Sequence, residues 1–215
     1  MTGEPALLVL ASASPRRAEL LRAAGLAFTV ELSGVDEDLP RAVAPEQGAL
    51  QLALRKARAV ARGRPGMEAF VLGADTIVAL DEGGAVRLLG KPATSAEAAA
   101  MLRALSGTTH RVVTGVCAVR CRDGALATGA ETTHVTMRPI RPAEVEAYVA
   151  SGEWRDKAGG YAIQESADRF VTALEGGGFD NVVGLPVELA LACLRRLGFV
   201  APAARDREGR HSDAR

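Results

Sequence analysis

Hydrophobic and polar residues follow one another in patterns that predict strands and helices in mixed order. An uninterrupted apolar run at 6–11 is typical of a buried strand, and residues 15–24 are predicted to form the helix after it. A longer helix is predicted between Pro45 and Arg62. Its apolar positions lie at helical spacing: Leu50, Leu54, Ala57 and Ala61. The pattern therefore predicts a chain that contains both strands and helices.

The second half of the chain repeats this mixture. Residues 110–119 and 130–137 are strand-like runs on either side of a turn at 122–124, which predicts an antiparallel hairpin. His110 and His134 would then lie near strand edges. The remaining predictions are helices at 96–105, 142–150 and 186–197, strands at 28–32, 70–80 and 170–174, and a loop at 176–181.

The charge balance and the cysteine content restrict the kinds of partner that this chain is expected to bind. The 26 basic and 26 acidic residues cancel, so the chain has no general attraction to nucleic acid or to an anionic membrane. Cys117, Cys121 and Cys193 are too few and too irregularly placed for a disulfide framework, and no histidine cluster accompanies them to bind zinc. We expect no leader peptide, and no apolar run approaches the roughly 20 residues of a membrane span. We expect free thiols, a soluble cytoplasmic protein and a small-molecule partner.

The length of 215 residues suits one compact unit. Residues 1–200 are predicted to form a single domain, since no linker or internal repeat divides them. Residues 201–215 are charged, small and without pattern, so we expect a disordered tail there.

The hexapeptide at 12–17, Ser-Ala-Ser-Pro-Arg-Arg, lies where the first strand should end and a helix should begin. Ser14 suits the N-cap and Pro15 suits the first helical position. The free N–H groups of a helix start, together with Arg16 and Arg17, favour an anion and above all a phosphate chain. An ordinary helix start with two solvated arginines is the alternative.

A carboxylate interrupts the apolar run at 70–80. Burial of Asp75 is costly unless a cation or hydrogen-bond donors satisfy it. Gly73 and Ala74 remove side-chain bulk just before it, so a ligand could approach the backbone closely there. This strand is therefore a second candidate for the site.

Several other charged positions allow two interpretations. Residues 36–38, Asp-Glu-Asp, could form a solvated turn, or could hold a hard divalent cation if they face the arginines. Lys56 lies on a predicted helix whose charged faces are usually solvated. Lys91 follows Gly90 and precedes Pro92, and such a rigid turn favours a fixed role.

The segment from Trp154 to Gln164 contains paired glycines beside aromatic and amide groups. Such a loop can fold tightly over a planar ligand, and Gln164 offers both a donor and an acceptor to the edge of a base. A plain glycine turn into a strand is the alternative.

These segments form an ordered series of motifs. They are Ser12-Ala-Ser-Pro-Arg-Arg17, Gly73-Ala-Asp-Thr76, Gly90-Lys-Pro92, Lys157-Ala-Gly-Gly-Tyr-Ala-Ile-Gln164 and Asn181-Val-Val-Gly-Leu-Pro186. In this order they resemble the Maf family of nucleoside triphosphate pyrophosphatases, over residues 6 to 198. Several motifs in order are far more specific than any single one.

The resemblance implies a fold similar to that of the inosine-triphosphate pyrophosphatases, an α/β fold in which a long mixed β-sheet and flanking helices form two lobes around a cleft. It implies hydrolysis of a nucleoside triphosphate to the monophosphate and pyrophosphate with a divalent metal cation, Mg²⁺ or Mn²⁺, and it suggests a homodimer. Asp75 matches the family's catalytic aspartate. By the same match, phosphate binding is expected at Ser12, Arg17, Lys56 and Lys91, and metal binding at Asp75 and Glu37.

Three positions point to one branch of that family. Arg16, Thr76 and Gln164 resemble the branch that prefers dTTP and UTP rather than the branch active on 7-methyl-GTP. An amide can pair with both the O4 acceptor and the N3–H donor of thymine or uracil, whereas a carboxylate only accepts. We therefore expect hydrolysis of dTTP, UTP and modified pyrimidine nucleotides, a house-cleaning role in the nucleotide pool. A non-catalytic, nucleotide-binding regulator of cell division is the alternative.

Overall fold

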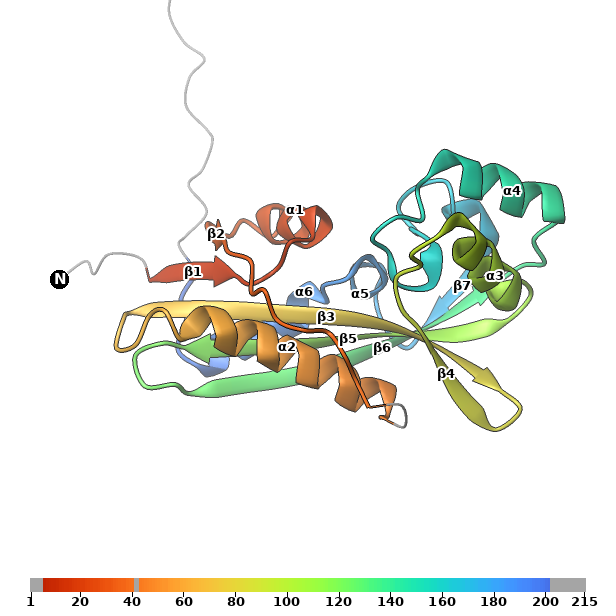
Figure 1. Cartoon of the computed structure of the whole chain (residues 1–215). Coiled ribbons are helices and arrows are strands. Elements are labelled where there is room, and N and C mark those ends of the chain that lie inside the picture. Colours follow the sequence, from red (N-terminus) through yellow and green to blue (C-terminus); the bar gives the residue numbers. More distant parts are fainter. Residues whose placement is uncertain (1–5, 41–42, 202–215) are drawn as a thin grey trace, which may run out of the picture.

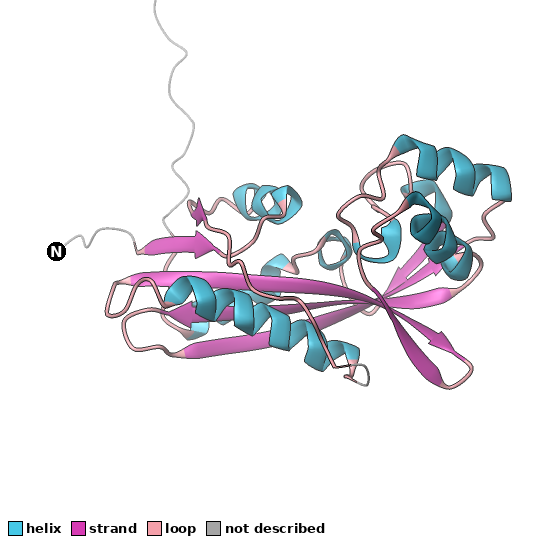
Figure 2. Ribbon diagram, in the orientation of Figure 1, coloured by secondary structure: helices cyan, strands magenta, loops and turns pink. Residues whose placement is uncertain are grey.

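A mixed seven-stranded sheet forms the centre of the molecule (Figure 1, Figure 2). The computed structural model describes residues 6–40 and 43–201. The strands are β1 (Leu7–Leu10), β2 (Thr29–Val30), β3 (Ala69–Glu82), β4 (Ala85–Leu89), β5 (Thr109–Arg120), β6 (Leu126–Met137) and β7 (Val171–Glu175). They lie in the order β2-β1-β3-β5-β6-β7, and β4 pairs with β3 outside this path. β1 is parallel to β2 and β3, whereas the other pairs are antiparallel.

Helices flank this sheet along its whole length. They are α1 (Pro15–Ala23), α2 (Pro45–Ala61), α3 (Ser95–Leu105), α4 (Pro142–Ser151), α5 (Phe179–Val183) and α6 (Val187–Arg196), with 3-10 turns η1 (Ala158–Gly160) and η2 (Asp168–Phe170). The expected α/β fold with a long mixed sheet and flanking helices is confirmed. Among the described residues, no helix has the length and apolar character that crossing a membrane would require.

Two lobes share the long strands β3, β5 and β6 (Figure 1). In the first lobe, alternate residues of β3 point to opposite faces: Leu72 packs with the side of α1 and α6, and Val71 packs with α2. In the second lobe, α3 and α4 close a separate core around Leu102, Tyr148 and Phe170. Since the strands pass through both cores, they fix the lobes relative to each other.

Helix α2 lies unusually close to the sheet at two glycines. A Cβ atom on Gly73 of β3 would lie 2.4 Å from the Ala53 carbonyl oxygen, and one on Gly115 of β5 would lie 2.4 Å from the Ala49 carbonyl carbon. Real Cβ atoms do not approach so closely, so only glycine allows this contact. The close approach determines where α2 places its charged side chains.

The buried face of α2 differs from the predicted one. Leu50 and Leu54 are only half-buried, whereas the buried positions are Pro45, Gly48, Ala49, Leu52, Ala53, Lys56, Ala57 and Val60. The reason is that α2 packs against β3 and β5 together and therefore buries a wider stripe than apolar spacing alone indicates. This stripe includes Lys56, which the helix pattern had placed on a solvated face.

Three further predictions are wrong. His110 does not lie at an edge: it is 1% exposed, and its Nε2 is 2.8 Å from the Tyr161 hydroxyl oxygen, because the segment after α4 covers this part of β5. The predicted loop at 176–181 ends early, since α5 begins at Phe179. His134 is exposed but does not lie at an edge either, because it pairs with Arg111 of β5 and Glu175 of β7. The three cysteines are buried free thiols, as expected. The predicted tail lies outside the described residues from 202 onward.

Candidate active site

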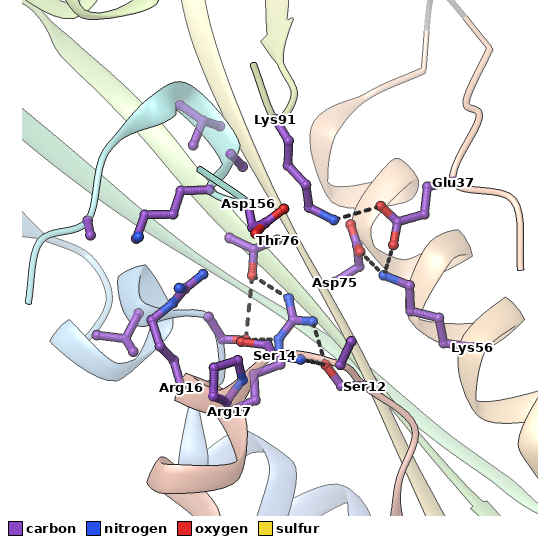
Figure 3. Close-up of a pocket in the computed structure, with 18 of the residues that line it drawn as sticks. Ser12, Ser14, Arg16, Arg17, Glu37, Lys56, Asp75, Thr76, Lys91 and Asp156 are labelled. Carbon is purple, nitrogen blue, oxygen red and sulfur yellow. Dashed lines mark hydrogen bonds and ion pairs between the residues drawn. The ribbon is translucent and has the colours of Figure 1, made fainter. Parts of the chain in front are cut away.

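The loop between β1 and α1 forms one wall of a pocket (Figure 3). β1 ends at Leu10 and α1 begins at Pro15, and Ser14 occupies the N-cap position with extended backbone. The Ser14 side chain makes no capping hydrogen bond; its backbone N–H donates instead to Ser12 Oγ at 3.2 Å. Ser12 is itself 6% exposed. The strand–helix junction is therefore as predicted, with Ser12 rather than Ser14 organising the loop.

Arg17 is built into the protein instead of standing free in solvent. Its Nε donates to the Gly184 carbonyl at 2.7 Å, and its two terminal nitrogens donate to Ser12 Oγ at 3.1 Å and Thr76 Oγ1 at 3.0 Å. Burial lowers the pKa of the Arg17 guanidinium, and the negative charge of Asp75 opposes that shift. Arg17 thus connects α1, β3 and the loop after α5.

A buried lysine joins two carboxylates from different elements. Lys56 of α2 donates from Nζ to Asp75 Oδ1 on β3, and the same Nζ lies 2.6 Å from Glu37 Oε1. The side chains of Lys56 and Asp75 are 8% and 9% exposed. The ion pair satisfies the buried carboxylate, as the sequence required, and brings Glu37 to it from a loop 38 residues earlier in the chain.

Glu37 is also held by a second lysine. Lys91 Nζ donates to Glu37 Oε2 at 3.0 Å, from a side chain that is half exposed. Partial burial acts to raise the pKa of Glu37, but the ammonium groups of Lys56 and Lys91 outweigh it and lower the pKa from 4.5 to about 2. Glu37 is therefore ionised at neutral pH, and the lysines that were assigned to phosphate lie beside it.

Thr76, next to Asp75 on β3, connects that strand with α1 and β5. Its hydroxyl accepts from Arg17 and lies 2.9 Å from Thr114 Oγ1 on β5. Thr114 in turn donates to the Asn181 carbonyl at 3.0 Å. Thr114 was missed in the sequence, because its relevance arises only from the register that pairs it with Thr76 across β3 and β5.

All of the predicted site residues line this one pocket, whose volume is about 730 Å³. They are Ser12, Arg16, Arg17, Glu37, Lys56, Asp75, Thr76, Lys91 and Gln164. Arg16 is half-buried and Gln164 is exposed, and neither makes a side-chain hydrogen bond within the described chain. The polar groups of both side chains are therefore without a partner among the described residues.

The sequence interpretation named the segment from Trp154 to Gln164 but assigned no role to three of its charged residues, which line the pocket. They are Arg155, Asp156 and Lys157, in the segment between α4 and η1, and Ala158 separates them from the glycine pair. Their position beside the Gly-Gly-Tyr motif was a signal that could have identified them. The segment is fixed against the other wall, because the Gly159 N–H donates to the Gly90 carbonyl at 3.0 Å next to Lys91.

The carboxylate oxygens around Lys56 are suited to a hard divalent cation whose remaining ligands come from a substrate and from water. Two carboxylates, Asp75 and Glu37, converge on a single cationic atom, Lys56 Nζ. The described residues contain no group of three or more His, Cys, Asp and Glu side chains placed to hold a metal ion. Mg²⁺ is usually bound by one or two carboxylates, with phosphate and water oxygens completing the shell, and this pair matches that pattern.

Comparison with known proteins identifies relatives over nearly the whole chain. A dTTP/UTP pyrophosphatase of Koribacter versatilis is 48% identical over 193 residues, which are 90% of this chain and 95% of the relative. One of Moorella thermoacetica is 51% identical over 180 residues, covering 84% of this chain and 89% of the relative. One of Caulobacter vibrioides is 45% identical over 200 residues, covering 93% and 99%.

The family model described as Maf-like protein matches residues 7–197. This range runs from β1 to the end of α6 and so includes every segment that lines the pocket. The chain belongs to the Maf-like protein family.

Proposed function

We propose that this protein hydrolyses nucleoside triphosphates to the monophosphate and pyrophosphate, with dTTP and UTP as substrates. The observation that carries the proposal is the Asp75–Lys56–Glu37 ion cluster, in which Lys56 and Asp75 are buried and which faces the start of α1 across one pocket. Relatives at 45–51% identity are named dTTP/UTP pyrophosphatase, which supports the same reaction and disfavours a non-catalytic regulator.

Cationic groups of the pocket hold the triphosphate in this proposal. Ser12, Arg17 and the start of α1 contact it from one wall, and Lys56 and Lys91 contact it from the other. These groups stabilise the charge that develops on the leaving pyrophosphate without forming a covalent intermediate.

Asp75 positions the attacking water or accepts its proton. The water oxygen bonds to the α-phosphorus, the bond from that phosphorus to the oxygen bridging to the β-phosphate breaks, and pyrophosphate leaves. Asp75 and Glu37 would hold the divalent cation, Mg²⁺ or Mn²⁺, which neutralises charge on the phosphate oxygens when bound. Lys56 holds the two carboxylates close together before substrate arrives.

Gln164, Thr76 and Arg16 set the base preference. The amide of Gln164 is exposed at the pocket and can pair with O4 and N3–H of a pyrimidine. Thr76 and Arg16 bound the same pocket beside Arg17. We also propose a single domain over residues 1–200, a homodimer and a cytoplasmic location, which buried free thiols support.

The test is release of pyrophosphate from dTTP, UTP and GTP in the presence of Mn²⁺. Replacement of Asp75 by Asn should lower turnover about a hundredfold or more, the usual cost of losing such an electrostatic group. Asp81→Asn, an exposed carboxylate of the same strand, is the matched control and should retain full activity. Near-full activity of a normally folded Asp75→Asn variant would refute the catalytic assignment.

The same nucleotide panel tests the base preference. Gln164→Glu removes the donor of the amide, so activity on dTTP and UTP should fall relative to GTP. An unchanged ranking of nucleotides would remove Gln164 from this role. A wild-type protein that binds nucleotides without releasing pyrophosphate would favour the regulator instead.

A further inference from the structure

Asp156 has an unusual backbone conformation at the edge of the pocket. Among the described residues it is the one residue other than glycine with a positive φ, at 60°. Residues with a Cβ atom rarely adopt this region, and aspartate is among the few that tolerate it. Such conformations persist where the surrounding structure holds them, and they concentrate at functional sites.

The neighbours of Asp156 are engaged within the protein. The Arg155 guanidinium carbon lies 4.9 Å from the centre of the Trp154 ring, and Lys157 donates to the Glu153 carbonyl and lies 3.4 Å from Glu165 Oε1. In the described part of the chain, Asp156 makes neither a side-chain hydrogen bond nor an ion pair. It is exposed and lines the pocket, and Figure 3 shows its side chain among those of the pocket.

The segment that carries Asp156 is anchored on both sides. Trp154 is buried and its Nε1 donates to the Val149 carbonyl at 3.0 Å, and the Gly159 N–H donates to the Gly90 carbonyl at 3.0 Å. An unpaired carboxylate on an anchored loop is a preorganised hydrogen-bond acceptor for a ligand.

The chemistry of a pyrimidine nucleoside triphosphate restricts what such an acceptor can bind. A carboxylate only accepts hydrogen bonds, and the triphosphate carries acceptors and negative charge that repel it. The donors of the ligand are N3–H, which we assign to Gln164, and the sugar hydroxyls. dTTP and UTP have the 3′-hydroxyl in common, whereas the 2′-hydroxyl is present only in UTP.

We propose that Asp156 binds the sugar of the substrate by accepting a hydrogen bond from its 3′-hydroxyl. The inference rests on the proposed function, because it takes the nucleotide to lie with its base at Gln164 and its phosphates at Ser12 to Arg17. The proposal adds a sugar subsite between the base position and the phosphate position. Because the 3′-hydroxyl is present in both sugars, it also explains how one pocket accepts deoxyribose and ribose.

The experiment measures kcat/KM for dTTP and for 2′,3′-dideoxythymidine triphosphate with the wild type, Asp156→Gly and Asp156→Asn. The wild type should prefer dTTP by roughly 10- to 100-fold, the usual range for a hydrogen bond to a charged group. Asp156→Gly removes the carboxylate and tolerates positive φ, so it should hydrolyse both nucleotides equally, at the wild-type rate for the dideoxy substrate. Asp156→Asn keeps a weaker acceptor and should give an intermediate preference.

Thermal unfolding and a control variant separate this effect from loss of folding. Asp156→Gly should unfold no earlier than the wild type, because the backbone conformation suits glycine. Asp168 is an exposed carboxylate of the same lobe outside the pocket, so Asp168→Asn should change kcat/KM neither for dTTP nor for the dideoxy nucleotide.

Three results would overturn the proposal: a wild type that does not distinguish the two nucleotides, an Asp156→Gly variant that keeps the wild-type preference, or a loss of activity that added Mn²⁺ restores. The last would assign Asp156 to the cation. A wild type that releases no pyrophosphate from dTTP would refute the proposed function itself, which keeps the two failures distinct.

Discussion

At Lys56, one ammonium group compensates two carboxylates that would otherwise repel each other. The pair with Asp75 is almost fully buried, whereas Glu37 is partly exposed. Burial of either charge without a partner would be strongly unfavourable, so the three side chains form one electrostatic unit. A cation bound to the substrate would compete with Lys56 Nζ for the same two carboxylates.

We predict that Lys56→Met raises the pKa of Glu37 from about 2 towards its ordinary 4.5, because the closer of its two lysines is lost. Titration of the Glu37 carboxyl carbon by NMR measures this shift. Arg87→Gln removes a cation that pairs with Glu82 at the surface and should leave Glu37 unchanged. An unmoved pKa in Lys56→Met would mean that the ion cluster does not form in solution.

The contact of α2 with the sheet is the element that places this unit. Gly73 and Asp75 are two residues apart on β3 and share a face, and Gly115 is the partner of Asp75 across β5. The two glycines leave room for α2 at the point where Lys56 must reach Asp75. Helix, strand and register together bring the charges into contact.

Gly115→Ala should destabilise the protein by about 1–3 kcal/mol, because the added methyl group overlaps the α2 backbone and forces it to move. Urea unfolding measures the free-energy change, and pyrophosphate release should fall as Lys56 is displaced. At Gly63 an added Cβ would lie 3.7 Å from the Val60 carbonyl oxygen, so Gly63→Ala is the control and should change stability little. Equal stabilities of the two variants would contradict the close contact.

At the scale of the whole molecule, contacts join the long strands to the segment after α4 that covers part of β5. His110 of β5 and Tyr161 of the covering segment form a buried pair, with Nε2 and the hydroxyl oxygen 2.8 Å apart. Burial lowers the pKa of His110 from 6.5 to about 4. This pair links the sheet to the loop that carries Gln164.

We predict that acid weakens the folded state through His110. The unfolded chain binds a proton there below about pH 6.5, whereas the folded protein keeps the ring neutral down to about pH 4, so protons favour unfolding. The free energy of unfolding should therefore fall by up to about 3 kcal/mol across that window. His110→Gln should lose this part of the pH dependence, and His134→Gln, which changes an exposed histidine, should retain it. Parallel pH profiles for the wild type and His110→Gln would contradict the prediction.

The sequence by itself determined the elements and the composition of the site. The spacing of apolar residues and the turn residues between them predicted β1, α1 and the β5–β6 hairpin, because these elements depend on residues that are neighbours in the chain. The ordered motifs, and the family resemblance that they carry, predicted nine site residues that all line one cavity.

Only the tertiary structure decided how those residues pair. The burial of Lys56 and His110, the use of Arg17 as an internal connector and the contact of Thr76 with Thr114 all come from segments distant in the chain. Local propensity carries no information about such contacts, because they follow from strand register and from the depth at which α2 packs. For the same reason no role could be assigned to Asp156 from the sequence, since its positive φ and its unpaired carboxylate could be found only in the fold.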